Sequence, residues 1–452
     1  MSHPLHRITL PTGSRDTRHD AFAVGLRLSR VGSPRWQRYW AGALVLQLAE
    51  EALSRERHTA FSDREYLDVR RAIAVLRPDA TRACLHAILD GLIGGSPEAS
   101  RAVDALSAYA ARLEHTGEFG PAANVYTFVI EIARNAGLAD RLPYAHLRLG
   151  SCFRELGQMS LSVRAYDAGL SAAALYRDRR TESLLHIARA RLHQVNQRLE
   201  VARAILDEVL ATPDVIGSPD LRALAAHNRG VVAHQMGMVS KQDSDFFAAI
   251  EYLGIALHTY TQREQRARAL NDLGRCLFHL GRRVSARRAS HAAFLSATDR
   301  ANKWACGNNL IMIAVADGDR DTFEAFRVML ARSPMPGPLR VENLLEVSEG
   351  HFAFGAPDLA RHALRRAARL ARRLGLASHL REAEEGLAEG GWTKKEPRTP
   401  PEVLPAAVRE VEDAILTLRY QSRLIATSVG DSAFPSRSDR DMLSWSNMHT
   451  VR

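Results

Sequence analysis

Short sequence blocks of one layout recur between about residues 104 and 375, and they constrain the fold more than any other feature. Each block consists of an apolar helix, a turn usually centred on glycine, and a second helix with a small residue near its start. One helical hairpin cannot bury its own apolar face, so hairpins repeated at a near-constant period stack into a solenoid. The clearest block contains, in order, Leu149, Gly150, Phe153, Leu156, Gly157, Met159, Ser162, Tyr166 and Gly169.

The turns and the crossings of the two helices are predicted at fixed places. Glycine at the turn supplies a left-handed backbone at the end of the first helix. A small residue five positions later lets the second helix cross the first closely, although Phe323 breaks this rule and residues 238–245 interrupt the fourth hairpin. The predicted turns are Gly117, Gly157, Gln197, Gly237, Gly281, Gly318 and Gly355, at intervals of 40, 40, 40, 44, 37 and 37 residues, and the small residues are Ala122, Ser162, Ala202, Ala286 and Ala360.

Three blocks carry a pattern that is similar to a known family: Leu149, Gly150, Phe153, Gly157, Ser162 and Tyr166 in one, Leu273, Gly274, Leu277, Gly281 and Ala286 in another, and Gly117, Ala122 and Tyr126 in a third. The layout resembles the tetratricopeptide repeat family, although its period exceeds the usual length of about 34 residues. The resemblance implies an all-α, right-handed superhelical solenoid of about seven antiparallel hairpins.

The rest of the chain is predicted to flank this array. The helices before it lack the turn glycine and are expected to be degenerate hairpins that cap the array. The amphipathic helix after it either folds back as a cap or mediates self-association or docking onto another protein. We therefore expect a disordered N-terminus at 1–20, the degenerate hairpins at 21–95, the array at 96–389, a proline-rich linker at 390–404, the amphipathic helix at 405–427 and a disordered tail at 428–452.

The charge of the chain is carried almost entirely by arginine. The formal net charge is +10, and lysine occurs only at Lys241, Lys303, Lys394 and Lys395. Either codon bias in a GC-rich genome or selection for phosphate and carboxylate partners explains this composition. No lysine follows a glycine, so a phosphate-binding loop that ends in Gly-Lys-Ser/Thr is excluded.

The remaining composition favours a cytoplasmic protein without catalytic chemistry. The longest apolar stretch, at 41–49, is too short to cross a bilayer. The four cysteines show no Cys-x-x-Cys spacing and are expected to be buried thiols. Known catalytic motifs are absent, and histidines such as His279 and His351 are scattered over separate helices. We expect no enzyme activity, no metal and no cofactor.

A concave groove along the first helices is the predicted binding site for a protein or peptide. Asn228 and Asn309 resemble groove asparagines of the kinesin light chain and of bacterial peptide-pheromone receptors, whose amides clamp an extended peptide. The alternative is that both amides bond an adjacent helix. The predicted groove residues are Arg148, Arg191, Asn228, Asp272, Arg275 and Asn309.

A second candidate site is a stripe on one helix, formed by Arg361, Arg365, Arg369 and Arg372. Their spacing places them on one side of the helix, where they could bind an anionic partner. The alternative is a solvated outer face.

Three hypotheses of function follow. The first is a non-catalytic scaffold or adaptor that holds a protein segment in the groove. The second is a regulatory protein whose superhelix changes shape when it binds a peptide or ligand. The third, nucleic-acid binding through the arginine stripe, lacks a recognisable DNA-reading module.

Overall fold

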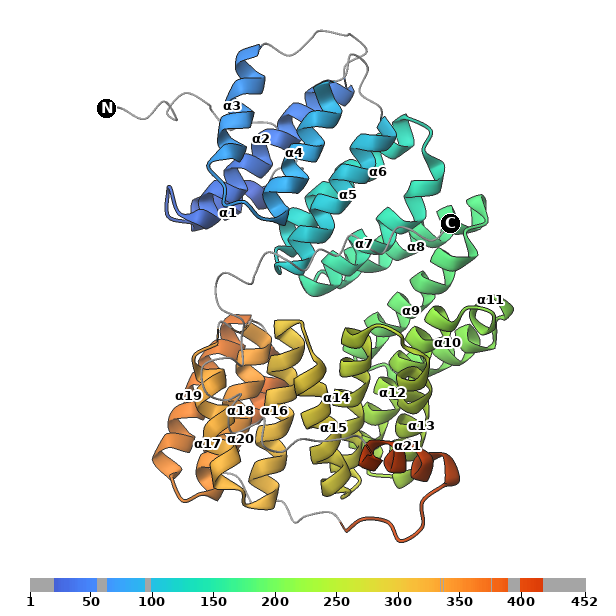
Figure 1. Cartoon of the computed structure of the whole chain (residues 1–452), viewed down its shortest axis with the longest axis vertical. Coiled ribbons are helices and arrows are strands. Elements are labelled where there is room, and N and C mark those ends of the chain that lie inside the picture. Colours follow the sequence, from blue (N-terminus) through green and yellow to red (C-terminus); the bar gives the residue numbers. More distant parts are fainter. Residues whose placement is uncertain are drawn as a thin grey trace. The chain divides into compact units, whose positions relative to one another are not determined.

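The computed structural model describes residues 20–54, 63–93, 99–333, 335, 337–374, 376–388 and 399–417. Within these ranges the chain forms α-helices and one short 3-10 helix and has no strand, so the predicted all-α class is confirmed (Figure 1). The predicted disordered tail at 428–452, residues 1–19 of the predicted N-terminal segment and most of the linker lie outside the described residues.

The chain divides into two compact units between Leu192 and His193, inside the segment predicted as one array. Unit 1 comprises the described residues up to Leu192, and unit 2 comprises the described residues from His193 to Thr417. The helices of unit 1 are α1 (Asp20–Leu28), α2 (Pro34–Ser54), α3 (Asp63–Ala74), α4 (Ala80–Ile93), α5 (Ala99–His115), α6 (Phe119–Asn135), η3 (Ala139–Arg141), α7 (Leu142–Glu155), α8 (Met159–Tyr176) and α9 (Arg179–Val195), whose last three residues cross the division.

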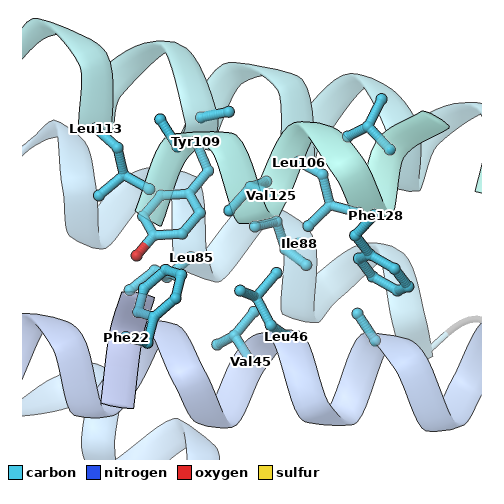
Figure 2. Close-up of a cluster of buried hydrophobic side chains, with 14 of the residues drawn as sticks. Phe22, Val45, Leu46, Leu85, Ile88, Leu106, Tyr109, Leu113, Val125 and Phe128 are labelled. Carbon is cyan, nitrogen blue, oxygen red and sulfur yellow. The ribbon is translucent and has the colours of Figure 1, made fainter. Parts of the chain in front are cut away.

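The four helices before the first regular hairpin share one apolar core with it. Helix α4 packs on α5, and α1 packs on both α2 and α6. In this core the ring of Tyr109 from α5 lies beside Phe22 of α1 (Figure 2). Gly42 on α2 makes the approach possible, because a Cβ there would lie 2.3 Å from Tyr109 Oη. Packing on neighbours, rather than turn chemistry, therefore positions these helices.

Unit 2 consists of stacked hairpins. Each first helix packs on its own second helix and on the next first helix, which is the arrangement expected of a helical repeat. Its helices are α10 (Leu199–Ala211), α11 (Pro213–Ile216), α12 (Pro219–Ser240), α13 (Asp243–Thr259), α14 (Arg263–His279), α15 (Arg283–Ser296), α16 (Arg300–Asp317), α17 (Arg320–Ala331), α18 (Gly337–Ala353), α19 (Pro357–Leu374), α20 (Ala377–Ala388) and α21 (Ala406–Thr417).

Six of the seven predicted turns have the expected backbone. Gln197 has a φ of 58°, and the five glycines at the other predicted turns have φ between 73° and 83°. In each case the N–H of the next residue donates to the carbonyl five positions back, as Gln158 does to Phe153 at 2.9 Å. These are Schellman ends, which satisfy carbonyls that a helix terminus would otherwise leave unpaired.

The fourth turn was predicted at the wrong residue. Gly237 lies inside α12, and the left-handed residue is Lys241, with a φ of 61°. Its N–H donates to the Gly237 carbonyl at 2.9 Å. The intervals between turns therefore become 40, 40, 44, 40, 37 and 37 residues. The position equivalent to Arg148, nine residues before the turn, is the buried Val232 and not Asn228.

The residue five positions after each turn is buried at the helix crossing. Where it is small, the helices approach directly, and Ser162 Oγ even donates to the Gly150 carbonyl at 2.8 Å. Where it is phenylalanine, its ring packs against a glycine of a first helix. A Cβ on Gly237, in the same hairpin, would lie 3.0 Å from the Phe246 ring, and one on Gly350, on the first helix of the next hairpin, would lie 2.1 Å from Phe323 Cε2. A phenylalanine at this position therefore packs where the neighbouring helix has no side chain.

Helix α21 packs on the second helices α13 and α15, and not beyond α20 at the end of the array. Its apolar side joins the core of unit 2 through Val408, Val411 and Ile415. Its buried Glu412 accepts hydrogen bonds from Arg282 Nε and Nη2 at 2.9 and 2.8 Å, and from Ser285 Oγ at 2.5 Å. The described part of the apolar stripe is therefore covered by the chain itself and is not available for self-association. The rest of the predicted helix, 418–427, lies outside the described residues.

We predict that Gly350→Ala lowers the unfolding free energy by about 1–2 kcal/mol. The new methyl group would meet the fully buried Phe323 ring, and overpacking of about 1–3 kcal/mol outweighs the gain of about 1 kcal/mol in helix propensity. Urea denaturation of the full chain, followed by circular dichroism, measures the change. Gly91→Ala is the control, because a Cβ there has no neighbour within 4 Å. Equal stability of the two variants would contradict the prediction.

We predict that Glu412→Ala releases α21. The substitution removes the partner of Arg282 and Ser285 and costs about 1–3 kcal/mol of docking free energy. Hydrogen exchange measured by mass spectrometry should show faster exchange in residues 406–417. Glu410→Ala, an exposed position on the same helix, should leave the exchange unchanged. Unaltered protection in Glu412→Ala would show that apolar contacts alone hold the helix.

Candidate functional site

The first helices of unit 2, α12, α14, α16 and α18, are consecutive neighbours that together present one surface. Their partly exposed positions recur every three or four residues, or after seven residues between Ala305 and Met312, so these positions lie along one side of each helix. We call them the first-helix surface: Asn228, Val231, Gln235 and Met238 on α12, Arg268, Asp272, Arg275 and His279 on α14, Ala305, Met312 and Ala316 on α16, and Glu342, Glu346 and Glu349 on α18.

The chemistry of this surface changes from helix to helix. Helix α12 contributes amide and apolar side chains, and α14 contributes the exposed guanidinium groups of Arg268 and Arg275. Helix α16 contributes alanine and methionine, whereas all three positions on α18 are glutamate. A basic band and an acidic band are therefore separated by an apolar one.

Asp272, one of the predicted groove residues, connects α14 to α12. Its Oδ2 lies 2.8 Å from His227 Nε2, and His227 Nδ1 lies 3.2 Å from Tyr260 Oη. With a carboxylate as acceptor, Nε2 carries the proton, and in the neutral ring Nδ1 accepts from the tyrosine hydroxyl. His227 was not predicted, because it precedes Asn228 by one residue and so lies about 100° around the helix from it.

The two predicted asparagines bond within the chain. Asn228 Nδ2 donates to the Leu224 carbonyl of its own helix at 2.7 Å. Asn309 is buried, and its Nδ2 donates to Asn271 Oδ1 on α14 at 2.7 Å. A second amide pair, Asn343 to Asn308 at 3.0 Å, joins α18 to α16. Asn309 thus bonds an adjacent helix, which was the alternative interpretation. The other three asparagines of this ladder, Asn271, Asn308 and Asn343, were not predicted.

Arg275 is exposed on α14, and its positive charge affects a histidine on the neighbouring helix α12. Burial first, and then the charge of Arg275, lower the pKa of His234 on α12 to about 2. His234 is therefore neutral at all physiological pH values, and its ring lies 5.3 Å from that of His279. Arg275 itself faces outward, where it can bind a carboxylate.

The predicted groove residues of unit 1 have different surroundings. Arg148 on α7 forms a bidentate ion pair with Glu114 on α5, with Nε–Oε1 and Nη2–Oε2 distances of 3.1 and 2.7 Å. Arg191 is exposed on α9. Arg148 therefore ties one first helix to the preceding one and is already paired with a carboxylate.

The four arginines of the predicted stripe on α19 differ in their ion-pair partners. Arg361 pairs with Asp358 at 2.7 Å, and Arg372 pairs with Glu384 of α20 at 2.8 Å. Arg365 and Arg369 are exposed and have no ion-pair partner among the described residues. Only part of the predicted stripe is thus available for an anion.

The cysteine side chains have the character of core residues. Cys152, Cys276 and Cys306 are buried free thiols, and burial raises the pKa of each one. They are therefore protonated and unreactive at neutral pH. Over the described residues, no three His, Cys, Asp or Glu side chains are grouped to hold a metal ion. Of the helices described, none has the length and hydropathy needed to cross a bilayer.

Solved structures with similar arrangements are helical proteins of low sequence identity. A tetratricopeptide repeat protein from Parabacteroides merdae is 13% identical, with a TM-score of 0.42 over 62% of this chain and 98% of its own. The apo form of the quorum sensor NprR from B. thuringiensis is 12% identical, with a TM-score of 0.47 over 78% of this chain and 92% of its own. The Cut9–Hcn1 assembly of APC/C is 12% identical, with a TM-score of 0.36 over 88% and 95%.

No family model and no curated protein matches the chain. Its own hairpins define the fold. They have the layout of tetratricopeptide repeats, with a left-handed turn and a close helix crossing in each copy.

We predict that the two asparagines respond differently to substitution. Asn309→Ala should lower the unfolding free energy by about 1–3 kcal/mol, because Asn271 Oδ1 would be left buried without its donor. Asn228→Ala should change it by less than about 0.5 kcal/mol, because only a local bond within a helix is lost. Urea denaturation of both variants tests this. Similar stabilities would mean that the amide ladder contributes nothing to packing.

Proposed function

We propose that the protein is a non-catalytic interaction scaffold that binds an extended protein segment across the first-helix surface of unit 2. The observation that carries the proposal is the order of bands on that surface, basic on α14, apolar on α16 and acidic on α18. A segment with an acidic side chain, an apolar middle and a basic side chain complements all three bands. Charge complementarity of this kind selects both the partner and its direction.

The side chains beneath this surface hold it in a fixed geometry. The His227–Asp272 contact and the two asparagine pairs link each first helix to the next. A surface that is rigid before binding loses less conformational entropy when a partner docks. In this proposal Arg275 and Asp272 contact the segment, and Asn228 is a neighbouring polar contact. Asn309 acts from below as a positioning residue.

The spacing of the helices sets the length of the segment. Packed helix axes lie about 8–10 Å apart, so α14 and α18 are separated by about 20 Å. Extended chain rises about 3.3 Å per residue, and the acidic and basic residues of the segment are therefore about six positions apart. The four free thiols suit a reducing compartment, and we place the protein in the cytoplasm.

Peptide display on the immobilised full chain tests this function. We expect enriched peptides to carry an acidic residue about six positions from a basic one, bracketing apolar residues. The variant Arg268→Glu/Arg275→Glu should bind the selected peptides with at least about tenfold lower affinity, measured by fluorescence polarisation. The same variant should regain affinity when the acidic residue of the peptide is changed to lysine.

The control for this experiment is Arg320→Glu/Arg365→Glu, which reverses two exposed charges away from the first-helix surface. Its affinity for the peptides should stay within about twofold of the wild type. An absence of enriched peptides, or equal losses in the two charge-reversal variants, would refute the proposed site.

A further inference from the structure

A cavity of about 680 Å³ lies between α17, α18 and α19, away from the first-helix surface. Its walls carry five arginines and two histidines but no aspartate or glutamate. We call it the arginine cavity, and its basic lining residues are Arg327 on α17, Arg340 and His351 on α18, and His362, Arg366, Arg369 and Arg373 on α19.

The periodicity of α19 explains how one helix supplies most of this charge. Arg366, Arg369 and Arg373 are three and four residues apart, so their side chains leave the same side of the helix. Only Arg369 was part of the predicted stripe. At about 100° per residue, Arg366 and Arg373 lie about a third of a turn away from Arg361, Arg365 and Arg372, and Arg369 lies between the two groups. The buried alanines of α19 fix which side of the helix faces α18.

Three of the five cavity arginines lack the carboxylate partner that several other arginines of unit 2 have. Arg282 pairs with Glu412, and both Arg283 and Arg287 pair with Asp317. By contrast, Arg366, Arg369 and Arg373 have no ion-pair or hydrogen-bond partner among the described residues. The positive charge gathered on this side of α19 is therefore not compensated by the protein.

The other two cavity arginines are held in place and remain charged. Arg340 donates through Nη1 to the Leu330 carbonyl at 3.1 Å and through Nη2 to the Ser333 carbonyl. These neutral acceptors orient the guanidinium without cancelling its charge. Burial, and then the charge of Arg366, lower the pKa of Arg340, which places the two cations close together. Arg327 is partly balanced by Glu324, with Nη2–Oε2 at 2.6 Å.

Clustered like charges without counter-ions destabilise a fold, so a ligand that neutralises them gains binding free energy. The volume lies within the range of about 300–1,000 Å³ that is usual for small-molecule sites. Apolar side chains, including Leu344 and Val347, complete the wall and can contact the uncharged part of a ligand. Guanidinium groups from three helices match a ligand that presents several oxyanion groups side by side.

We propose that the arginine cavity binds a small molecule that carries adjacent phosphate groups. Adjacent phosphates concentrate more negative charge in a given volume than carboxylates do, and each offers several acceptor oxygens to the guanidinium forks. One phosphate reaches Arg366 and Arg369 on α19, while a neighbouring phosphate meets Arg340 at the start of α18. The site is independent of the protein segment proposed for the first-helix surface.

Isothermal titration calorimetry of the full chain with sodium tripolyphosphate tests the proposal. We expect saturable binding that weakens as salt is added, and weaker binding of orthophosphate, which cannot reach arginines on two helices at once. The Arg366→Ala/Arg369→Ala variant should lose at least about tenfold in affinity. The matched control, Arg365→Ala/Arg381→Ala, removes two exposed charges outside the cavity and should lose less than about twofold.

Several outcomes would overturn the proposal: no heat of binding at low ionic strength, equal losses in the two variants, or orthophosphate affinity equal to that of tripolyphosphate. Tight binding of duplex DNA with equal losses in both variants would reveal a diffuse cationic surface instead. Thermal melting checks that each variant is folded. If the double variant unfolds, Arg373→Gln replaces it, with the same expected loss of tripolyphosphate affinity.

Discussion

The contact at which the second helix of a hairpin crosses the first determines the rest of this structure. The crossing has room for one small side chain, or for one ring opposite a glycine, as with Phe246 and Gly237. Close approach there lets a short hairpin present its remaining apolar positions to the next one. The first helices consequently lie side by side and can be cross-bonded by pairs such as Asn309 and Asn271. The surface proposed for binding thus depends on helix packing several residues away from it.

Local turn chemistry made most of the fold predictable from the sequence. Glycine at a helix end has a direct backbone cause, so six of the seven turns were located correctly. Gly237 misled the prediction because it serves packing: it leaves space for Phe246, while Lys241 adopts the left-handed conformation without being glycine. That error of four residues also shifted the register that placed Asn228 in the groove. Long-range partners, such as Glu412 with Arg282, have no signature in local sequence and could not be foreseen.

The sequence could predict which helices carry the polar groups of the candidate site, but not which of those side chains are exposed. The sequence indicates polar groups on the first helices, and Asp272 and Arg275 do lie on their exposed side. It does not reveal which side-chain amides form hydrogen bonds with a neighbouring helix, because that depends on the rotation of each helix about its axis. The same rotation separates the arginines of α19 into those that line the cavity and those that point away from it. One array therefore presents two surfaces of different chemistry, one of mixed charge and one of concentrated positive charge.

The docking of α21 has a mechanical consequence. The chain leaves α20 at Ala388 and is anchored again at Leu404, in the core beside α13 and α15. Sixteen peptide units span at most about 55 Å, at roughly 3.5 Å each. The last hairpins therefore cannot be drawn further than this from the middle of unit 2 while α21 stays bound. The C-terminal segment is thus a covalent tether between the end of the helical array and its middle.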